Sequence, residues 1–182
     1  MTVLVKIQVF SFLMTFLFAS SCVNYDRLIE EGKKESESGN QVEAIIKFNK
    51  ALLKDDKRIE AYYGLGFSYG ENCKKIDTNC QQSIDFFTQV IEMDSSYRHA
   101  FYNRANNYIQ IKDFEAALKD LTNKYTINKI DADYYGNRSI CYLETGDTVL
   151  SHANYVYAVK LNQSKQSYYL ENIFDRYFSR KW

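Results

Sequence analysis

A helical repeat of about 34 residues constrains the fold of this chain more than any other feature of its sequence. Four similar segments begin at residues 44, 83, 117 and 151, so the last three are evenly spaced. Each segment begins with a small residue, has a large one four positions later and, in three of the four, an alanine or valine three positions after that. These columns are Ala44, Ser83, Ala117 and Ser151, then Phe48, Phe87, Leu121 and Tyr155, then Ala51, Val90, Lys124 and Ala158. Spacings of four and three keep the columns on one face of a helix. The pattern predicts an all-α fold of stacked helix pairs.

The segments before these helices share the same frame. In each unit a bulky residue is followed four positions later by a small one. The pairs are Leu28 and Gly32, Tyr62 and Gly66, Phe101 and Ala105, and Tyr135 and Ser139. Together with the turns at Lys112-Asp113 and Gly146-Asp147, the segments AFYNRANNYIQIKDFEAALKDL and YYGNRSICYLETGD closely resemble tetratricopeptide (TPR) repeats. The resemblance implies a TPR helix-turn-helix solenoid over residues 25–163. We expect four units, at about 25–58, 59–97, 98–131 and 132–165, and a C-terminal capping helix at 166–182.

The chain departs from the usual TPR pattern at three places. The proline that commonly ends a unit is replaced by Asp56, Ser95, Lys129 and Gln163, so the turns must rely on Asp, Asn and Ser side chains. Unit two has about five extra residues between its helices, which predicts a protruding loop. The first unit is mostly charged and is expected either to form a polar cap or to fray.

Two cysteines, Cys73 and Cys80, fall in this insertion. In an oxidising compartment they could form a disulfide, and the alternative is a pair of free thiols. No metal site is expected there, because no His or second Cys pair lies nearby to complete a tetrahedral set. Cys141 lies on an apolar helical face and is expected in the core.

Residues 1–21 read as an export signal. Their only charge is Lys6, and an apolar run from Ile7 ends in small residues before Cys22. This run is too short for a comfortable bilayer span. Ala19-Ser20-Ser21-Cys22 resembles the lipobox of bacterial lipoproteins, with Ala19 in place of the usual leucine. We therefore expect residues 1–21 to be removed, Cys22 to carry lipid and residues 22–24 to act as a tether; a conventional cleaved signal and an uncleaved anchor are the alternatives.

The TPR resemblance also implies where a partner binds, because the first helices of TPR units line a concave groove. The exposed positions of these helices are expected to be Glu60, Tyr63, Phe67, His99, Tyr102, Asn103, Asn106, Asp133, Asn137 and Ile140. Asparagine offers a peptide backbone both a donor and an acceptor, and tyrosine gives rigid contact area. The alternative is that Tyr63 and Tyr102 only pack between helices. The TPR clamp for C-terminal carboxylates is not expected, since Glu60, His99 and Asp133 stand where basic groups would be needed.

The sequence predicts no catalytic residue, cofactor or metal. Neither His99 nor His152 has a recognisable nucleophile or ligand partner, and no phosphate-binding loop is present. Equal numbers of basic and acidic residues, 23 each, argue against a nucleic-acid partner. We expect a non-enzymatic adaptor for a protein or peptide, exported to the cell envelope and held at the outer membrane, on its periplasmic side or surface, through the N-terminal lipid alone. The alternatives are an immunity protein that neutralises a toxin delivered to the periplasm, and a regulator of a neighbouring envelope enzyme.

Overall fold

The computed structural model describes residues 24–73, 77–123 and 132–162. Their helices are a first helix at residues 24–37, then α2 (Gln41–Leu52), α3 (Ile59–Cys73), α4 (Asp77–Met93), α5 (Arg98–Gln110), α6 (Phe114–Leu121), α7 (Ala132–Glu144) and α8 (Thr148–Asn162). These three ranges contain no strand. The expected signal, Cys22 and the capping helix at 166–182 lie outside them. The first helix already includes Asn24, which was expected to belong to the tether at 22–24.

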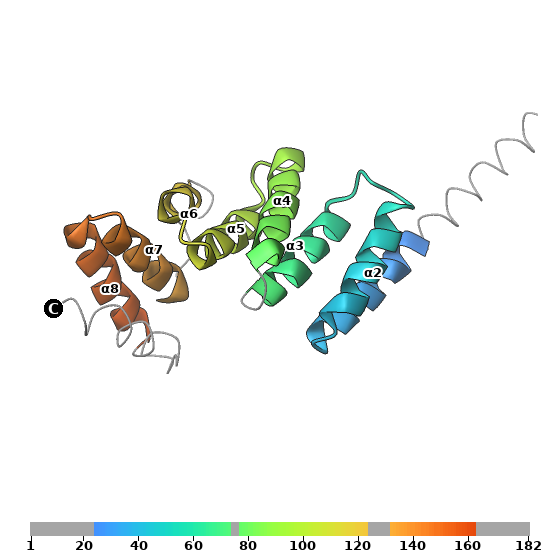
Figure 1. Ribbon diagram of the computed structural model, residues 1–182, viewed down its shortest axis with the longest axis horizontal. Helices are drawn as coiled ribbons and strands as arrows, with labels where there is room; N and C mark the ends of the chain where they lie inside the picture. Colours follow the sequence, from blue (N-terminus) through green and yellow to red (C-terminus); the bar gives the residue numbers. More distant parts are fainter. Residues whose placement is uncertain (1–23, 74–76, 124–131, 163–182) are drawn as a thin grey trace, which may run out of the picture.

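The helices form four antiparallel pairs that follow one another along the long axis of the molecule (Figure 1). Each helix packs on the next in the chain from α2 to α8. In addition, α3 contacts α5 and α5 contacts α7, so the first helices of successive pairs lie side by side. This arrangement is the all-α solenoid expected from the repeat, and it places three helices along one surface.

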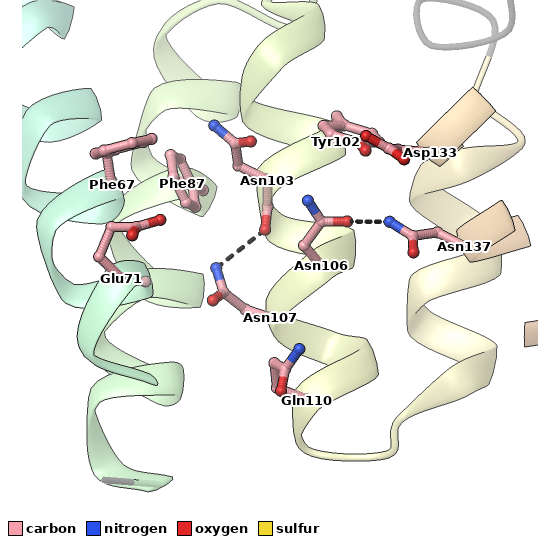
Figure 2. Close-up of a pocket in the computed structure, with 11 residues that line it drawn as sticks. Phe67, Glu71, Phe87, Tyr102, Asn103, Asn106, Asn107, Gln110, Asp133 and Asn137 are labelled. Atoms are coloured by element: carbon pink, nitrogen blue, oxygen red, sulfur yellow. Dashed lines mark hydrogen bonds between the residues drawn. The ribbon is translucent and has the colours of Figure 1, made fainter. Parts of the chain in front are cut away.

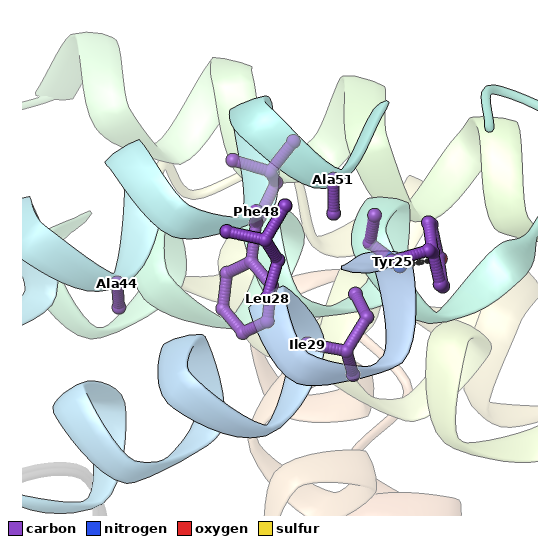
Figure 3. Packing of buried hydrophobic residues seen from close by; sticks show 8 residues of the cluster. Tyr25, Leu28, Ile29, Ala44, Phe48 and Ala51 are labelled. Carbon is purple, nitrogen blue, oxygen red and sulfur yellow. Dashed lines mark hydrogen bonds between the residues drawn. The ribbon is translucent and has the colours of Figure 1, made fainter. Parts of the chain in front are cut away.

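The repeat columns form the contacts within and between pairs. Ala44, Ser83, Ala117 and Ser151 are all buried. In the first pair, Leu28 and Ile29 of the first helix face Phe48 of α2 (Figure 3). A Cβ added to Gly32 would lie 2.7 Å from the ring carbon Cε1 of Phe48, so only glycine allows this close approach. The first helix, although highly charged, is therefore anchored by a buried apolar face and does not fray.

A partly buried arginine joins the helices of the third pair. The guanidinium of Arg104 on α5 donates to both carboxylate oxygens of Asp120 on α6, at 2.7 and 2.8 Å, and to the hydroxyl of Thr88 on α4 at 2.9 Å. In the fourth pair Arg138 donates instead to the amide oxygen of Asn154 at 2.6 Å. The two arginines are one repeat apart in the sequence and connect equivalent helices.

The prediction of a protruding loop in unit two is wrong. The extra residues lengthen the helices instead, so that α3 has 15 residues and α4 has 17. Cys73 is the last residue of α3, Cys80 lies in the first turn of α4, and a disulfide joins them. Both cysteines are buried, so the bond closes the end of a helical hairpin.

Aspartate side chains form the first two turns between units, which agrees with the expected reliance on Asp, Asn and Ser side chains. The carboxylate of Asp55 accepts from the backbone N–H of Lys57, and that of Asp94 accepts from the backbone N–H and the hydroxyl of Ser96. These side-chain bonds fix the chain reversal that proline would otherwise favour. Both hydrogen bonds from Ser96 lower the pKa of Asp94. The bond from the hydroxyl contributes more than the bond from the backbone N–H.

Candidate functional site

A pocket of about 260 Å³ opens where the first helices of the second, third and fourth pairs meet (Figure 2). Its floor comes from α5, and its sides come from α3 and α7, with one ring from α4. The lining residues are Phe67, Gly70, Glu71, Phe87, Tyr102, Asn103, Asn106, Asn107, Gln110, Asp133 and Asn137. Five of these are carboxamides, and three are aromatic. A pocket of this size accommodates one or two side chains of a partner, since drug-sized ligands use cavities from about 300 Å³ upward.

Hydrogen bonds inside the protein fix the orientation of the asparagine amides. The Asn103 amide nitrogen donates to the Tyr63 hydroxyl at 3.0 Å. Asn107 donates to the hydroxyl of Ser83 at 2.8 Å and to the backbone carbonyl of Asn103 at 3.0 Å. Asn107 is itself buried, and a Cβ on Gly70 would lie 3.3 Å from its amide oxygen. The glycine thus lets α3 approach this amide.

A second amide pair connects α5 to α7. Asn137 donates from its amide nitrogen to the amide oxygen of Asn106 at 2.8 Å, as Figure 2 shows. Asn137 is buried, and no hydrogen bond to its own amide oxygen is found. A buried acceptor without a partner costs roughly 1–3 kcal/mol. This cost falls on the packing between α5 and α7, since the oxygen is too buried for a ligand to reach.

The charged side chains among the described lining residues are all acidic. Glu71 on α3 and Asp133 on α7 flank the amides of α5 from opposite sides (Figure 2). None of the eleven lining residues is Lys, Arg or His. The surface is thus polar, aromatic and negative.

The structure brings six of the ten expected groove residues together in this pocket: Phe67, Tyr102, Asn103, Asn106, Asp133 and Asn137. Glu60 and His99 are exposed but do not line it. The Glu60 carboxylate instead accepts from Arg58 at 3.1 Å.

The prediction that Ile140 lines the groove is wrong. It is only 3% exposed and belongs to a small core cluster with Leu143, against which Phe114 and Tyr155 pack. Its position corresponds to that of Asn106 one repeat earlier, but its apolar side chain is stabilised by leaving water.

Tyr63 packs between helices, which is the alternative given above to a role in the groove. Its ring centroid is 5.6 Å from that of Phe87 and 5.3 Å from that of Tyr97. Burial raises the pKa of the Tyr63 hydroxyl, and the neighbouring Tyr97 raises it by a smaller amount. Tyr63 therefore supports the pocket by positioning Asn103.

Sequence reasoning missed five lining residues: Gly70, Glu71, Phe87, Asn107 and Gln110. Glu71 and Gln110 each lie one turn beyond an expected groove residue, so extending the same helical stripe by four positions would have found both. Phe87 had been assigned to the core, where it does pack, and its ring also reaches the pocket. Asn107 carried no signal, because the equivalent residues of the neighbouring units are a serine and a cysteine in the core, Ser68 and Cys141.

The other residues with reactive side chains give little chemistry. Burial raises the pKa of the Cys141 thiol to about 12, and the residue is fully buried. His152 is exposed on α8. In residues 24–73, 77–123 and 132–162, no cluster of three or more His, Cys, Asp or Glu side chains could hold a metal ion.

Two curated relatives share part of this sequence. Human tetratricopeptide repeat protein 13 is 24% identical over 128 residues, which cover 70% of this chain and 15% of that protein. Human serine/threonine-protein phosphatase 5 is 45% identical over 42 residues, which cover 23% of this chain and 8% of the phosphatase. This chain therefore spans a small part of the relatives that it matches. No protein-family model matches the sequence.

Solved structures decide the fold. MamA from Desulfovibrio magneticus RS-1 superposes with a TM-score of 0.71 over 84% of this chain and 85% of its own, at 16% identity. The chain folds as a tetratricopeptide-repeat solenoid. Cut9 in the APC/C hetero-tetramer Cut9–Hcn1 gives the same TM-score over 84% of this chain and 29% of its own, at 14% identity. The TPR frame then assigns α3, α5 and α7 as the first helices of units two to four.

Proposed function

We propose that this TPR protein is a non-enzymatic adaptor that binds an extended segment of a partner protein in the pocket between α3, α5 and α7. The observation that carries the proposal is the row of five carboxamides on α5 and α7, with aromatic rings from α3, α4 and α5 beside it. Carboxamides pair with peptide groups, and rings give contact area at low entropic cost. Rigid helices hold these groups in place, which lowers the entropy lost on binding.

The absence of catalysis is part of the proposal. The buried Cys141 thiol, with its raised pKa, is a poor nucleophile. The pocket combines amides, rings and two carboxylates that come from different helices, and it contains no histidine. Such a set suits recognition better than proton transfer.

A benzoylphenylalanine crosslinker placed in the pocket tests the binding surface. We choose Phe67, which is 41% exposed in the pocket, and as a matched control Ile46, which is 39% exposed on α2. In intact cells, irradiation should give a discrete adduct with a protein from position 67 and none from position 46. Equal adducts at both positions, or none at 67, would rule out the pocket as the docking site.

We also propose that the adaptor is exported and anchored through lipid on Cys22. The support is the apolar run that ends at Ala19-Ser20-Ser21-Cys22. Within residues 24–73, 77–123 and 132–162, none of the helices combines the length and the apolar character needed to span a bilayer. Several acyl chains hold a protein firmly at a bilayer, since each buried methylene gains about 0.8 kcal/mol.

Replacing the lipid acceptor tests the anchor. Cys22→Ala should abolish incorporation of labelled palmitate and move the protein from the membrane to the soluble or unprocessed fraction. Ser21→Ala is the control, because alanine is as small as serine and should be processed normally. Unchanged labelling and fractionation of Cys22→Ala would refute the anchor without affecting the proposed binding pocket.

A further inference from the structure

The pocket presents more free hydrogen-bond acceptors than donors. The internal bonds of Asn103, Asn107 and Asn137 all use the amide nitrogen, and Asn107 uses both of its N–H groups. The amide oxygens of Asn103 and Asn107 form none of the described hydrogen bonds, whereas that of Asn137 is too buried for a ligand to reach. Only the Asn106 amide is held by its oxygen, which leaves its nitrogen as a donor. A ligand that matches this surface must be rich in donors.

The charge of the pocket selects the same kind of ligand. Glu71 adds a carboxylate to the amide oxygens, and none of the described lining residues is basic. Glu71 is exposed and forms no ion pair with any described residue. A cation is therefore attracted here, whereas a carboxylate would meet repulsion.

Among donor-rich cations, the guanidinium group fits the surroundings of Glu71 best. Phe67 lies one turn before Glu71 on α3, and its ring is 41% exposed in the pocket. Arginine combines five N–H donors in a plane with a flat face that stacks on aromatic rings, while lysine offers a compact and strongly hydrated charge. A planar group can therefore contact the ring and the carboxylate together.

We propose that the partner segment inserts an arginine side chain beside Glu71 and Phe67, with its N–H groups donating to the Glu71 carboxylate and to the free amide oxygens of α5. This inference rests on the proposed function, since it names the chemistry of the partner at the same pocket.

Peptide selection tests the proposal without knowledge of the partner. A phage library of random dodecamer peptides is selected on the full chain in detergent, with Glu71→Gln and the control Glu60→Gln selected in parallel. Glu60 is a suitable control because it is exposed on α3 but pairs with Arg58 and lies outside the pocket. The enriched peptides are then synthesised with Arg, Lys, Gln or Glu at the enriched basic position, and their affinities are measured by calorimetry.

The wild type and Glu60→Gln should enrich arginine-containing peptides. Replacing that arginine by glutamine should weaken binding about tenfold or more, as expected for a hydrogen bond to a charged group. Lysine should be intermediate, and Glu71→Gln should remove the preference for arginine over glutamine.

Several results would overturn the inference. Equal affinity for Arg and Gln peptides, or enrichment of acidic peptides, would show that the pocket does not select a cation. Equal affinity for Arg and Lys would exclude the guanidinium contact. In each of these cases the peptides still bind, so the adaptor function stands. Failure to select any peptide that competes with crosslinking at position 67 would instead count against the proposed function itself.

Discussion

Lys112 adopts a backbone conformation that favours glycine. Its φ is +64°, and it is the only non-glycine residue with positive φ in the described ranges. Gly146, one repeat later, occupies the same place with a φ of +93°. In both turns the next residue is an aspartate whose carboxylate accepts from a backbone N–H at the start of the second helix, Ala116 or Leu150.

Replacing this lysine should stabilise the protein. Left-handed backbone costs a non-glycine residue about 1 kcal/mol or more, which exceeds the entropy that glycine adds to the unfolded chain. Lys112→Gly should therefore raise the free energy of unfolding by about 0.5 kcal/mol, measured by urea denaturation. The converse change, Gly146→Lys, should lower it by a larger amount. A loss of stability in Lys112→Gly would contradict the strain argument.

Asp120 holds a buried charge pair that the next repeat replaces by a neutral one. It is 2% exposed and accepts both Arg104 bonds, whereas Asn154 receives a single bond from Arg138. Asp120→Ala should cost about 3–5 kcal/mol, because it leaves the guanidinium without its carboxylate. Asp120→Asn should cost less than half as much, since it recreates the contact of the fourth unit. Equal losses in thermal denaturation would show that the charge, not the acceptor, decides stability.

Tyr25 makes the first unit sensitive to alkaline pH. It is buried, and its hydroxyl accepts from the backbone N–H of Ala61 at 3.3 Å. Burial, together with the nearby Glu60 carboxylate, raises its pKa to about 12. The unfolded chain releases this proton near pH 10 and the folded chain does not, so the contribution of Tyr25 to stability is complete below pH 10 and is lost as the pH rises to 12.

The variant Tyr25→Phe tests this pH dependence. It should be less stable than the wild type at pH 8, because the N–H of Ala61 loses its acceptor. Its stability should then fall less steeply between pH 10 and pH 12, as followed by urea denaturation at each pH. Parallel curves for the two proteins would contradict the raised pKa.

At the scale of elements, the hairpin of α3 and α4 differs from the others in its length and its disulfide. Cys73 and Cys80 lie seven positions apart. Closing a loop of that length stabilises by about 2.5 kcal/mol on the chain-entropy estimate. Cys73→Ser/Cys80→Ser, or reduction of the wild type, should therefore lower the melting temperature by several degrees. Cys141 is buried and unpaired, so it should stay unmodified by iodoacetamide in the folded oxidised protein. A melting temperature indifferent to reductant would show that helix packing alone closes the hairpin.

The helices could be predicted from the sequence because their columns are set by local spacing. Phe48, Phe87 and Leu121 each fill the gap between a pair of helices, so the repeat period carries nearly the whole architecture. The secondary structure of the residues inserted in unit two could not be predicted in the same way. The composition of residues 70–80 suits a loop as well as a helix. The continuation of α3 to Cys73 depends on packing against α4.

The pocket was only partly predictable because exposure on an isolated helix differs from exposure in the stack. Tyr63 and Ile140 occupy groove positions by register, yet neighbouring helices bury both to a large extent. The direction of the asparagine amides was beyond the sequence, since it depends on partners such as Ser83 on α4 and Tyr63 on α3. These contacts between units decide that the pocket offers acceptors.

At the scale of the whole molecule, the described solenoid ends with an apolar face on α8. Val149, Leu150, Val156 and Tyr157 are between 43% and 77% exposed. The column of bulky residues at the first helices also continues beyond α8, because Tyr169 lies one repeat period after Tyr135. Tyr135 contacts Tyr157 of α8, with ring centroids 4.5 Å apart. A further first helix in the same frame would place Tyr169 against the next turn of this surface.

We propose that the helix expected at 166–182 caps the last repeat, so removing residues 163–182 should expose the end of the solenoid. Solenoid ends need a solvated outer face, and exposed apolar side chains associate in its absence. We expect the truncated chain to form oligomers in light-scattering chromatography and to melt at a lower temperature than the full chain. Adding Val149→Lys and Val156→Glu to the truncated chain should restore the monomer, because both side chains lie on the uncovered face, but should not restore the melting temperature. A truncated chain that stays monomeric with an unchanged melting temperature would show that α8 is already the end of the fold.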